Sequence, residues 1–158
     1  MSGGVRKIIV NQTADEVTAL AQDDLRLQVA KNVKKPNRLP ESNLVWRTLP
    51  ITRQITVTWS SVYGINWISG EVPQPGFGLR LSGVWKQVQQ GGSFELGPQA
   101  AWSSTREDTF LDRYFLVRNR YHEPVKVVIG IERAMGWDPI YVDPVPLQPG
   151  DAEDEVHG

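Results

Sequence analysis

The sequence contains no cysteine, and only two of its 158 residues are histidine. Without thiols it has no disulfides, no thiolate metal ligands and no cysteine nucleophile. The two histidines, His122 and His157, do not have the spacing of a zinc site. We therefore expect neither a metal site nor a cofactor.

Neither sign of charge is in large excess, since 17 Lys and Arg face 18 Asp and Glu. A protein that neutralises a run of phosphates needs a basic surplus, so nucleic acid is not an expected partner. No apolar run reaches the roughly 18 residues that a transmembrane helix requires. Residues 1–10 place two basic residues before only three apolar ones, too few for a signal peptide. We expect a protein that is cytoplasmic or is released without a conventional signal peptide.

Hydrophobic residues recur mainly at every second position, which is the period of a β-strand. This alternation of apolar residues with small or polar ones is seen at Leu25, Leu27 and Val29, and again at Ile55, Val57 and Trp59. Strands are predicted over residues 5–10, 25–30, 44–48, 55–60, 78–82, 84–88, 93–96, 114–119 and 125–132. The last of these is apolar on both faces, which predicts a central strand.

The fold predicted from this pattern is all-β and mainly antiparallel, a β-sandwich or jelly-roll-like domain with one or two short helices. A first helix is expected over residues 13–22, where Thr13 and Glu16 form a capping box. Ser104 and Glu107 form a second possible capping box, which predicts that another short helix begins there. Residues 1–148 are expected to form a single β-sandwich domain, followed by a flexible acidic tail over residues 149–158.

Charge is nevertheless unevenly distributed along the chain. Residues 31–53 hold six basic side chains and one acid, whereas residues 138–158 hold six acids and no Lys or Arg. Attraction between the acidic end of one subunit and the basic segment of another would build rings or filaments. A homo-oligomer is therefore expected.

Motifs that carry catalysis are missing from the sequence. It has no phosphate-binding loop and no nucleophile elbow, and His122 lies in an apparent turn before Pro124. Glu107, Asp108 and Asp112 are sequence neighbours and not carboxylates opposed across a cleft. The protein is therefore expected not to be an enzyme.

Aromatic residues are the most informative local feature. Trp59, Tyr63, Trp67, Phe77 and Trp85 are interleaved with glycine and proline. Trp67 is expected to be exposed because its neighbours include turn-forming residues, whereas Trp59 and Trp85 are assigned to the core. Phe77 either projects from a loop between two glycines or begins a strand and packs in the core.

Two arginines offer a second candidate surface. Arg118 and Arg120 share one face of a predicted strand, where guanidinium groups can bind a phosphate or carboxylate. The competing interpretation is that they pair with acids on a neighbouring strand.

In composition the chain resembles small β-sandwich lectins and soluble membrane-binding toxins, and also capsid and tail proteins. The aromatic, turn-rich region predicts a non-enzymatic binding module, lectin-like or toxin-like, which recognises a glycan or a membrane lipid headgroup through aromatic loop residues and can act as an oligomer. Its predicted ligand-binding residues are Trp67, Phe77, Tyr63, Arg118 and Arg120. The alternative is a structural subunit of a homo-oligomeric assembly of capsid, tail or filament type.

Overall fold

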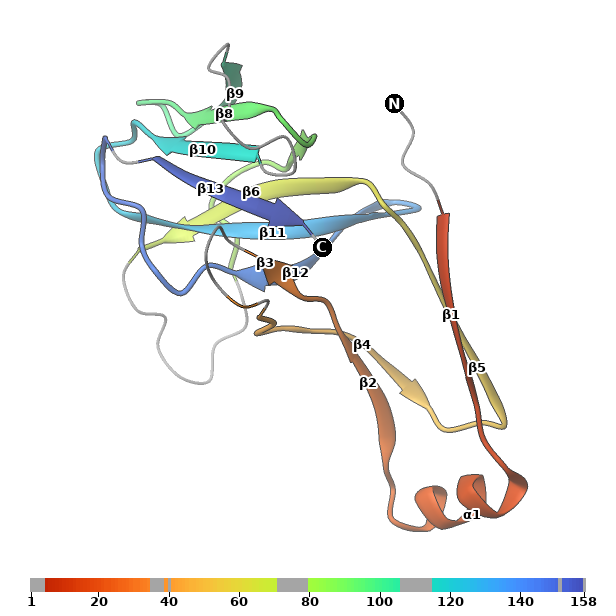
Figure 1. Ribbon diagram of the computed structural model, residues 1–158. Helices are drawn as coiled ribbons and strands as arrows, with labels where there is room; N and C mark the ends of the chain where they lie inside the picture. Colours follow the sequence, from red (N-terminus) through yellow and green to blue (C-terminus); the bar gives the residue numbers. More distant parts are fainter. Residues whose placement is uncertain are drawn as a thin grey trace.

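The computed structural model describes residues 5–34, 39, 41–70, 80–105, 115–150 and 152–157, with residues 34 and 152–157 described through their backbone. Two parts are evident in Figure 1: a body of two β-sheets, and a projecting arm that carries a helix at its tip. The predicted all-β, mainly antiparallel and sandwich-like fold is confirmed.

The body consists of a five-stranded and a four-stranded sheet. The first has the strand order β3 (Val33–Lys34), β13 (Ala152–His157), β10 (Phe115–Asn119), β8 (Ser93–Leu96) and β9 (Trp102–Thr105). The second has the order β12 (Gly136–Val142), β11 (Val125–Arg133), β6 (Tyr63–Ser69) and β7 (Lys86–Val88). Every described pair is antiparallel except β10 and β8, which run parallel.

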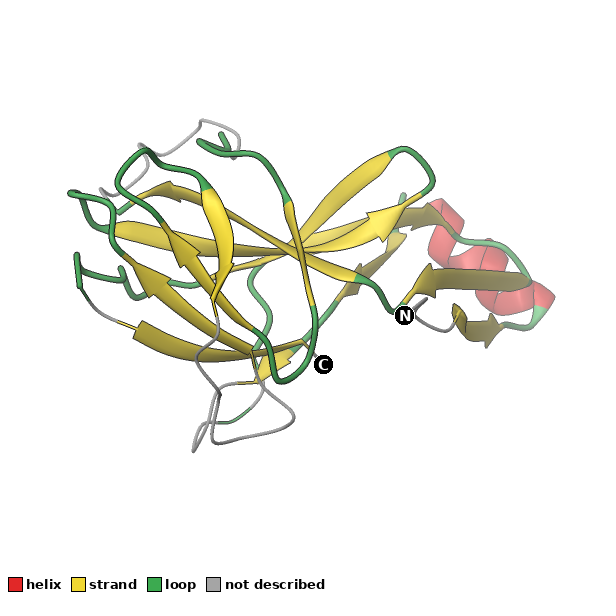
Figure 2. Cartoon of the chain, turned by 90° about the horizontal axis from the view of Figure 1, so that it is seen from above, coloured by secondary structure: helices red, strands yellow, loops and turns green. Residues whose placement is uncertain are grey.

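The arm, residues 5–30 and 45–60, consists of two antiparallel ribbons joined at the tip by α1 (Ala14–Gln22). One ribbon pairs β1 (Val5–Asn11) with β5 (Gln54–Ser60), and the other pairs β2 (Arg26–Ala30) with β4 (Val45–Pro50). Both views show it extending away from the body (Figures 1 and 2). The arm residues were included in the single sandwich domain predicted for residues 1–148, and their projection from the body was not predicted.

The hydrophobic core lies between the two sheets of the body. Strand β11 is central, as predicted, because β12 and β6 flank it on either side. Its residues Val125, Val127, Ile129 and Ile131 belong to the main core cluster, while Val128 and Gly130 are buried on the opposite face. The two-residue period therefore identified the strand, and the interruption of that period by Val128 and Gly130 indicated that its second face is also covered.

Helix α1 begins where the sequence predicts. Thr13 Oγ1 accepts a hydrogen bond from the Glu16 backbone N–H at 3.2 Å, and the Glu16 carboxylate accepts one from the Thr13 N–H at 2.9 Å. These reciprocal bonds satisfy two otherwise free donors at the helix start. Within the described residues this is the only helix, and it is too short and too polar to cross a membrane.

Three local predictions differ from the structure. Ser104 lies in β9 and does not begin a second helix, and residues 106–114, which would complete that helix, lie outside the described residues. The predicted strand at residues 78–82 is absent from its described part, residues 80–82. Residues 152–157, expected in a flexible tail, form β13 between β10 and β3, because their backbone completes the hydrogen-bond ladder of the five-stranded sheet.

Candidate functional site

Two of the predicted ligand-binding aromatics lie in the core. Trp67 is only 6% exposed and Tyr63 only 4%, and both point from β6 into the main core cluster with Ile65 between them. The prediction that Trp67 is exposed on a turn is therefore wrong. The alternation of Tyr63, Ile65 and Trp67 places all three on the buried face of a strand.

Asn66 explains why the turn prediction failed. Its amide does not form a turn but ties β6 to the chain beside it: Nδ2 donates to the Gly83 carbonyl, and Oδ1 accepts from the Gly83 and Trp67 backbone N–H groups, all at 2.8–3.1 Å. Gly83 packs so closely that a Cβ there would lie 2.5 Å from Trp67 Nε1. A buried strand can thus carry a polar residue because each of its polar atoms is bonded.

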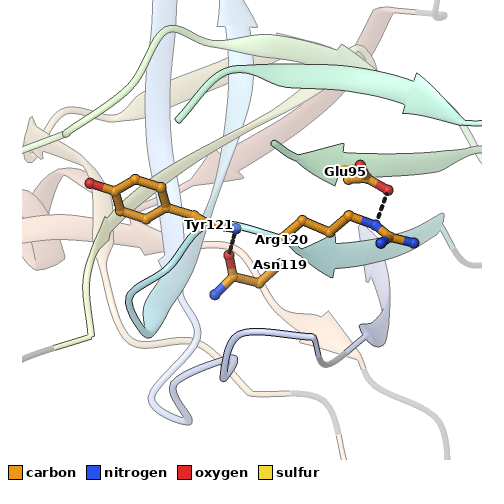
Figure 3. A network of polar contacts seen from close by, with 4 residues as sticks. All are labelled: Glu95, Asn119, Arg120 and Tyr121. Carbon is orange, nitrogen blue, oxygen red and sulfur yellow. Dashed lines mark hydrogen bonds and ion pairs between the residues drawn. The ribbon is translucent and has the colours of Figure 1, made fainter. Parts of the chain in front are cut away.

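The predicted arginine pair belongs to the outer face of the five-stranded sheet. Arg120 Nε donates to the Glu95 carboxylate at 2.8 Å across the sheet (Figure 3), and Arg118 lies opposite Glu95 in the β10–β8 register. Arg120 thus pairs with an acid on a neighbouring strand, which was the alternative to ligand binding. Beside it, the buried Asn119 Oδ1 accepts the Tyr121 backbone N–H.

The remaining predicted residues divide between the surface and undescribed segments. His122 is exposed in the bend that links β10 to β11, next to Glu123 and packed on Tyr121. Phe77, Glu107, Asp108 and Asp112 lie outside the described residues. The five predicted ligand-binding residues are therefore not brought together as one described site.

A different set of residues does converge, where the arm joins the body. We call this concavity the junction cleft; it holds about 690 Å³. The arm contributes Val5, Trp46, Arg47, Thr58, Trp59 and Ser60 to its lining. The β11–β12 hairpin of the body contributes Glu132, Arg133, Ala134, Gly136 and Trp137. Three tryptophans from three strands thus meet charged side chains in one cleft.

Two glycines position the tryptophan on the body side. Gly64 and Gly130 lie opposite each other in the β6–β11 ladder, on the sheet face away from the core. A Cβ at Gly64 would lie 2.9 Å from Trp137, and one at Gly130 would lie 2.5 Å from Trp85. The glycine pair therefore leaves a flat floor on which Trp85 and Trp137 stack, with ring centroids 5.9 Å apart.

The tryptophans on the arm side are held by each other and by one carboxylate. Trp46 and Trp59 pack edge to face at 5.9 Å. Asp138 Oδ2 accepts a hydrogen bond from Trp46 Nε1 at 3.4 Å, and Asp138 Oδ1 lies 3.5 Å from Arg133 Nε. The Asp138 carboxylate therefore links the base of the arm to the body.

A bulge in β4 brings two consecutive side chains to the cleft. The β2–β4 register shifts between Val29 and Ala30, so Trp46 has no direct partner on β2. Such a bulge redirects side chains that would otherwise point to opposite faces. Trp46 and Arg47 both line the cleft, and the Arg47 guanidinium lies 4.9 Å from the Trp46 ring centroid.

The local electrostatics are dominated by cations near aromatic rings. Lys31 Nζ lies 4.2 Å from the Trp59 ring centroid and 5.9 Å from that of Tyr63. Burial lowers the pKa of Lys31, and the positive charge of Arg6 lowers it further. Burial raises the pKa of the Tyr63 hydroxyl, with Arg6 acting in the opposite direction.

The cleft combines indole rings with side chains of both charges. Among the described residues no three His, Cys, Asp or Glu side chains gather as a metal site. The cleft was not predicted, because the sequence pattern singled out neither Trp46 nor Trp137 and assigned Trp59 to the core. An aromatic residue beside a charged one, as in Trp46-Arg47 and Trp137-Asp138, was the available local signal.

No family model, curated protein or solved structure matches this chain.

Proposed function

We propose that this protein is a non-enzymatic binding module that recognises a glycan in the junction cleft. The observation that carries the proposal is the convergence of Trp46, Trp59 and Trp137 with Arg47, Glu132 and Arg133 in one concavity. A sugar ring offers an apolar face that stacks on indole and a rim of hydroxyls that bond to charged side chains.

The size and chemistry of the cleft support a small ligand. Its 690 Å³ falls within the roughly 300–1,000 Å³ that is typical of small-molecule sites. Its two walls hold both donors and acceptors, because Arg47 and Arg133 donate while Glu132 accepts. A ligand with many hydroxyls can use both kinds of group.

A soluble glycan is favoured over a membrane headgroup by the shape and charge of the arm. Trp46 and Trp59 are half-buried inside a concavity, where they cannot insert into a bilayer. The arm tip, which is the most projecting part, carries the acids Asp15, Glu16, Asp23 and Asp24. Negative charge at the tip opposes approach to an anionic membrane.

A glycan array followed by isothermal titration of the retained oligosaccharides tests the proposal. Trp46→Ala should weaken binding at least tenfold, since removing one aromatic anchor typically costs more than about 1.4 kcal/mol. Arg120→Gln is the matched control, because Arg120 lies on the far sheet of the body, and its affinity should equal that of the wild type.

Retention of no glycan, or equal binding by Trp46→Ala, would contradict the proposal. Cosedimentation with phosphatidylcholine vesicles, with and without phosphatidylserine, separates the other outcome. Vesicle binding with a blue shift of tryptophan emission, in the absence of glycan binding, would replace the glycan with a lipid headgroup.

A second candidate function, a subunit of a homo-oligomeric assembly, is favoured by β1. This strand has β5 as its only partner among the described residues, so its other edge is open. It is also exposed on both faces, with Val5 80%, Ile8 49% and Ile9 43% exposed. An open apolar edge is the usual site of strand addition by another chain.

The β1 sequence suits pairing with β1 of a second copy. In an antiparallel register centred on Ile8, Arg6 faces Val10 and Lys7 faces Ile9 of the other copy. Each positive charge is then opposed by an apolar residue and not by its own symmetry mate, which avoids like-charge repulsion across the ladder. The resulting twofold contact is self-complementary.

Analytical ultracentrifugation over a range of concentrations tests this second function. Ile8→Lys should shift the protein toward the monomer, because it places two like charges at the symmetry axis. Val84→Lys, at a position 85% exposed in the body, is the control and should leave the association unchanged. A wild-type protein that stays monomeric at every concentration and salt would exclude the assembly.

A further inference from the structure

Three cations lie around the two arm-side tryptophans, and none of them has a carboxylate partner among the described residues. Lys31 lies over Trp59, and Arg47 lies over Trp46. Arg6 is directly opposite Trp59 in the β1–β5 ladder, so both side chains project from the same face of that ribbon. Within the described part of the chain, no Asp or Glu oxygen lies within 4.0 Å of any of these cations.

The acids near the cleft do not offset this charge. Asp138 is already engaged by Arg133 and by the Trp46 indole N–H. Glu132 supplies the carboxylate of the lining itself. Arg47 and Arg133 line the cleft, and Arg6 and Lys31 lie beside its Trp59. These four cations exceed the two carboxylates, Glu132 in the lining and Asp138 next to it, by two positive charges.

Burial makes the unpaired ammonium costly. Lys31 is half-buried, and a cation removed from water needs a counter-charge or hydrogen-bond acceptors to recover its lost hydration. The lowered pKa of Lys31 has the same two causes, desolvation and the nearby Arg6. An anion beside Lys31 and Arg6 would relieve both.

An unpaired donor lies at the same place. Trp59 Nε1 is buried and has no acceptor among the described residues. A buried N–H without an acceptor is unfavourable, because the hydrogen bond that it made to water in the unfolded chain is not replaced. Within the described part of the chain, the Trp59 N–H thus has no acceptor and the three cations have no carboxylate partner. Donors of this kind together favour an oxyanion.

We infer that the saccharide bound in the junction cleft is acidic, and that a carboxylate or sulfate group on it is held by Lys31, Arg6 and Arg47 beside the indole N–H of Trp59. This inference rests on the proposed glycan-binding function and specifies the chemical class of the glycan. Trp46 and Trp137 supply stacking surface for the sugar rings, while the cations select the charged member of otherwise similar sugars.

Matched pairs of saccharides that differ only in charge test the inference by isothermal titration. Oligogalacturonates are compared with their methyl esters, and dextran sulfate oligosaccharides with dextran oligosaccharides. The charged member of at least one pair should bind tenfold or more tightly than its neutral counterpart at low salt. The preference should shrink as salt is added, because partly exposed charges are screened.

Two lysine variants assign the preference to the site. Lys31→Met should lower affinity for the charged saccharide toward that of the neutral one, while leaving affinity for the neutral one unchanged. Lys126→Met is the matched control: it removes the same charge from β11, at the opposite end of that strand from the lining residues Glu132 and Arg133, and should preserve the preference.

The outcomes separate this inference from the proposed function. Equal binding of charged and neutral members overturns the acidic ligand and leaves glycan binding standing. An unchanged preference in Lys31→Met overturns the assignment to these cations. Failure to bind any member of either pair, together with an empty glycan array, overturns both proposals.

Discussion

At the scale of single residues, Gly130 is required by the ring that lies on it. A Cβ would meet Trp85 at 2.5 Å, and that ring stacks on Trp137 of the cleft. Gly130→Ala should lower the free energy of unfolding by about 1–3 kcal/mol, the usual cost of overpacking. Urea denaturation followed by tryptophan fluorescence measures the loss.

Gly97→Ala is the matched control for this change. Its new Cβ would lie 3.6 Å from the nearest neighbouring atom, the Ala101 carbonyl oxygen, which is an ordinary contact. Equal stability of the two alanine variants would show that the Trp85 ring moves away freely and that the glycine floor does not fix it.

Lys31 should give stability a measurable dependence on alkaline pH. Its folded-state pKa is lowered from 10.5, so the folded protein holds this proton less tightly than the unfolded chain does. The charged form therefore costs stability at neutral pH, and the cost fades as the pH rises through the lowered pKa toward 10.5.

Lys31→Met should accordingly raise the free energy of unfolding at pH 7 and give a smaller advantage near pH 10.5. Tyr63, whose raised pKa makes stability fall above pH 10, is present in both proteins, so its effect largely cancels in the difference. Chemical denaturation at a series of pH values measures this difference. A constant gap between variant and wild type would mean that Lys31 titrates as it does in water.

At the scale of secondary-structure elements, α1 depends on its capping box. Thr13→Ala removes the acceptor for the Glu16 N–H and should destabilise the helix by about 1 kcal/mol. The effect should be local, because no residue of α1 is buried. Hydrogen exchange over residues 14–22 should accelerate, while exchange in the body stays unchanged.

Thr18→Ala in the same helix serves as the control. Thr18 Oγ1 only donates to the Ala14 carbonyl, which the helix already uses, and alanine has the higher helix propensity. Exchange in this variant should be unchanged or slower. Acceleration as large as that of Thr13→Ala would contradict a specific role for the cap.

The local sequence pattern predicted the strands and the helix better than it predicted the junction cleft. Alternation identified most of β2, β5, β8 and β11, and the spacing of Thr13 and Glu16 placed the start of α1, because these signals lie within one element. Strand β6 was missed because Asn66 and the flanking Ser69 and Gly70 were interpreted as turn formers. The buried bonds of the Asn66 amide to Gly83 depend on a segment brought alongside by folding.

The junction cleft could not be predicted for a related reason. Trp46 reaches it through a bulge in β4, and Trp137 through the β11–β12 hairpin lying on the glycine floor. Both depend on pairing between distant segments, which hydrophobic period does not encode. The arm itself, which brings Trp59 to the cleft, is also a consequence of such pairing.

At the scale of the whole molecule, the arm and the body should differ in local stability. Strand β1 has one partner strand among the described residues and is exposed on both faces, whereas β11 is flanked by two strands and is mostly buried. Fewer buried contacts allow more frequent local opening. Amide hydrogen exchange in β1 should therefore be at least tenfold faster than in β11.

Exchange followed by mass spectrometry of peptides over β1 and β11 measures this contrast. Equal protection in a monomeric sample would show that the arm opens only with the body. Protection of β1 that grows with protein concentration would instead indicate that a second copy covers its edge.

Because β5 of the arm continues almost directly into β6 of the body, a small rotation between these strands displaces the tip of the arm by a larger distance. Only Ser61 and Val62 separate the two strands, so one stretch of backbone passes from arm to body. Seven residues of β5 span roughly 23 Å at about 3.3 Å each. A rotation of about 10° at residues 61–62 would therefore carry the far end of that strand through about 4 Å. A ligand bound between Trp46 and Trp137 would contact both the arm and the body and would fix the angle between them. The orientation of α1 relative to the body would then differ between the free and the bound protein.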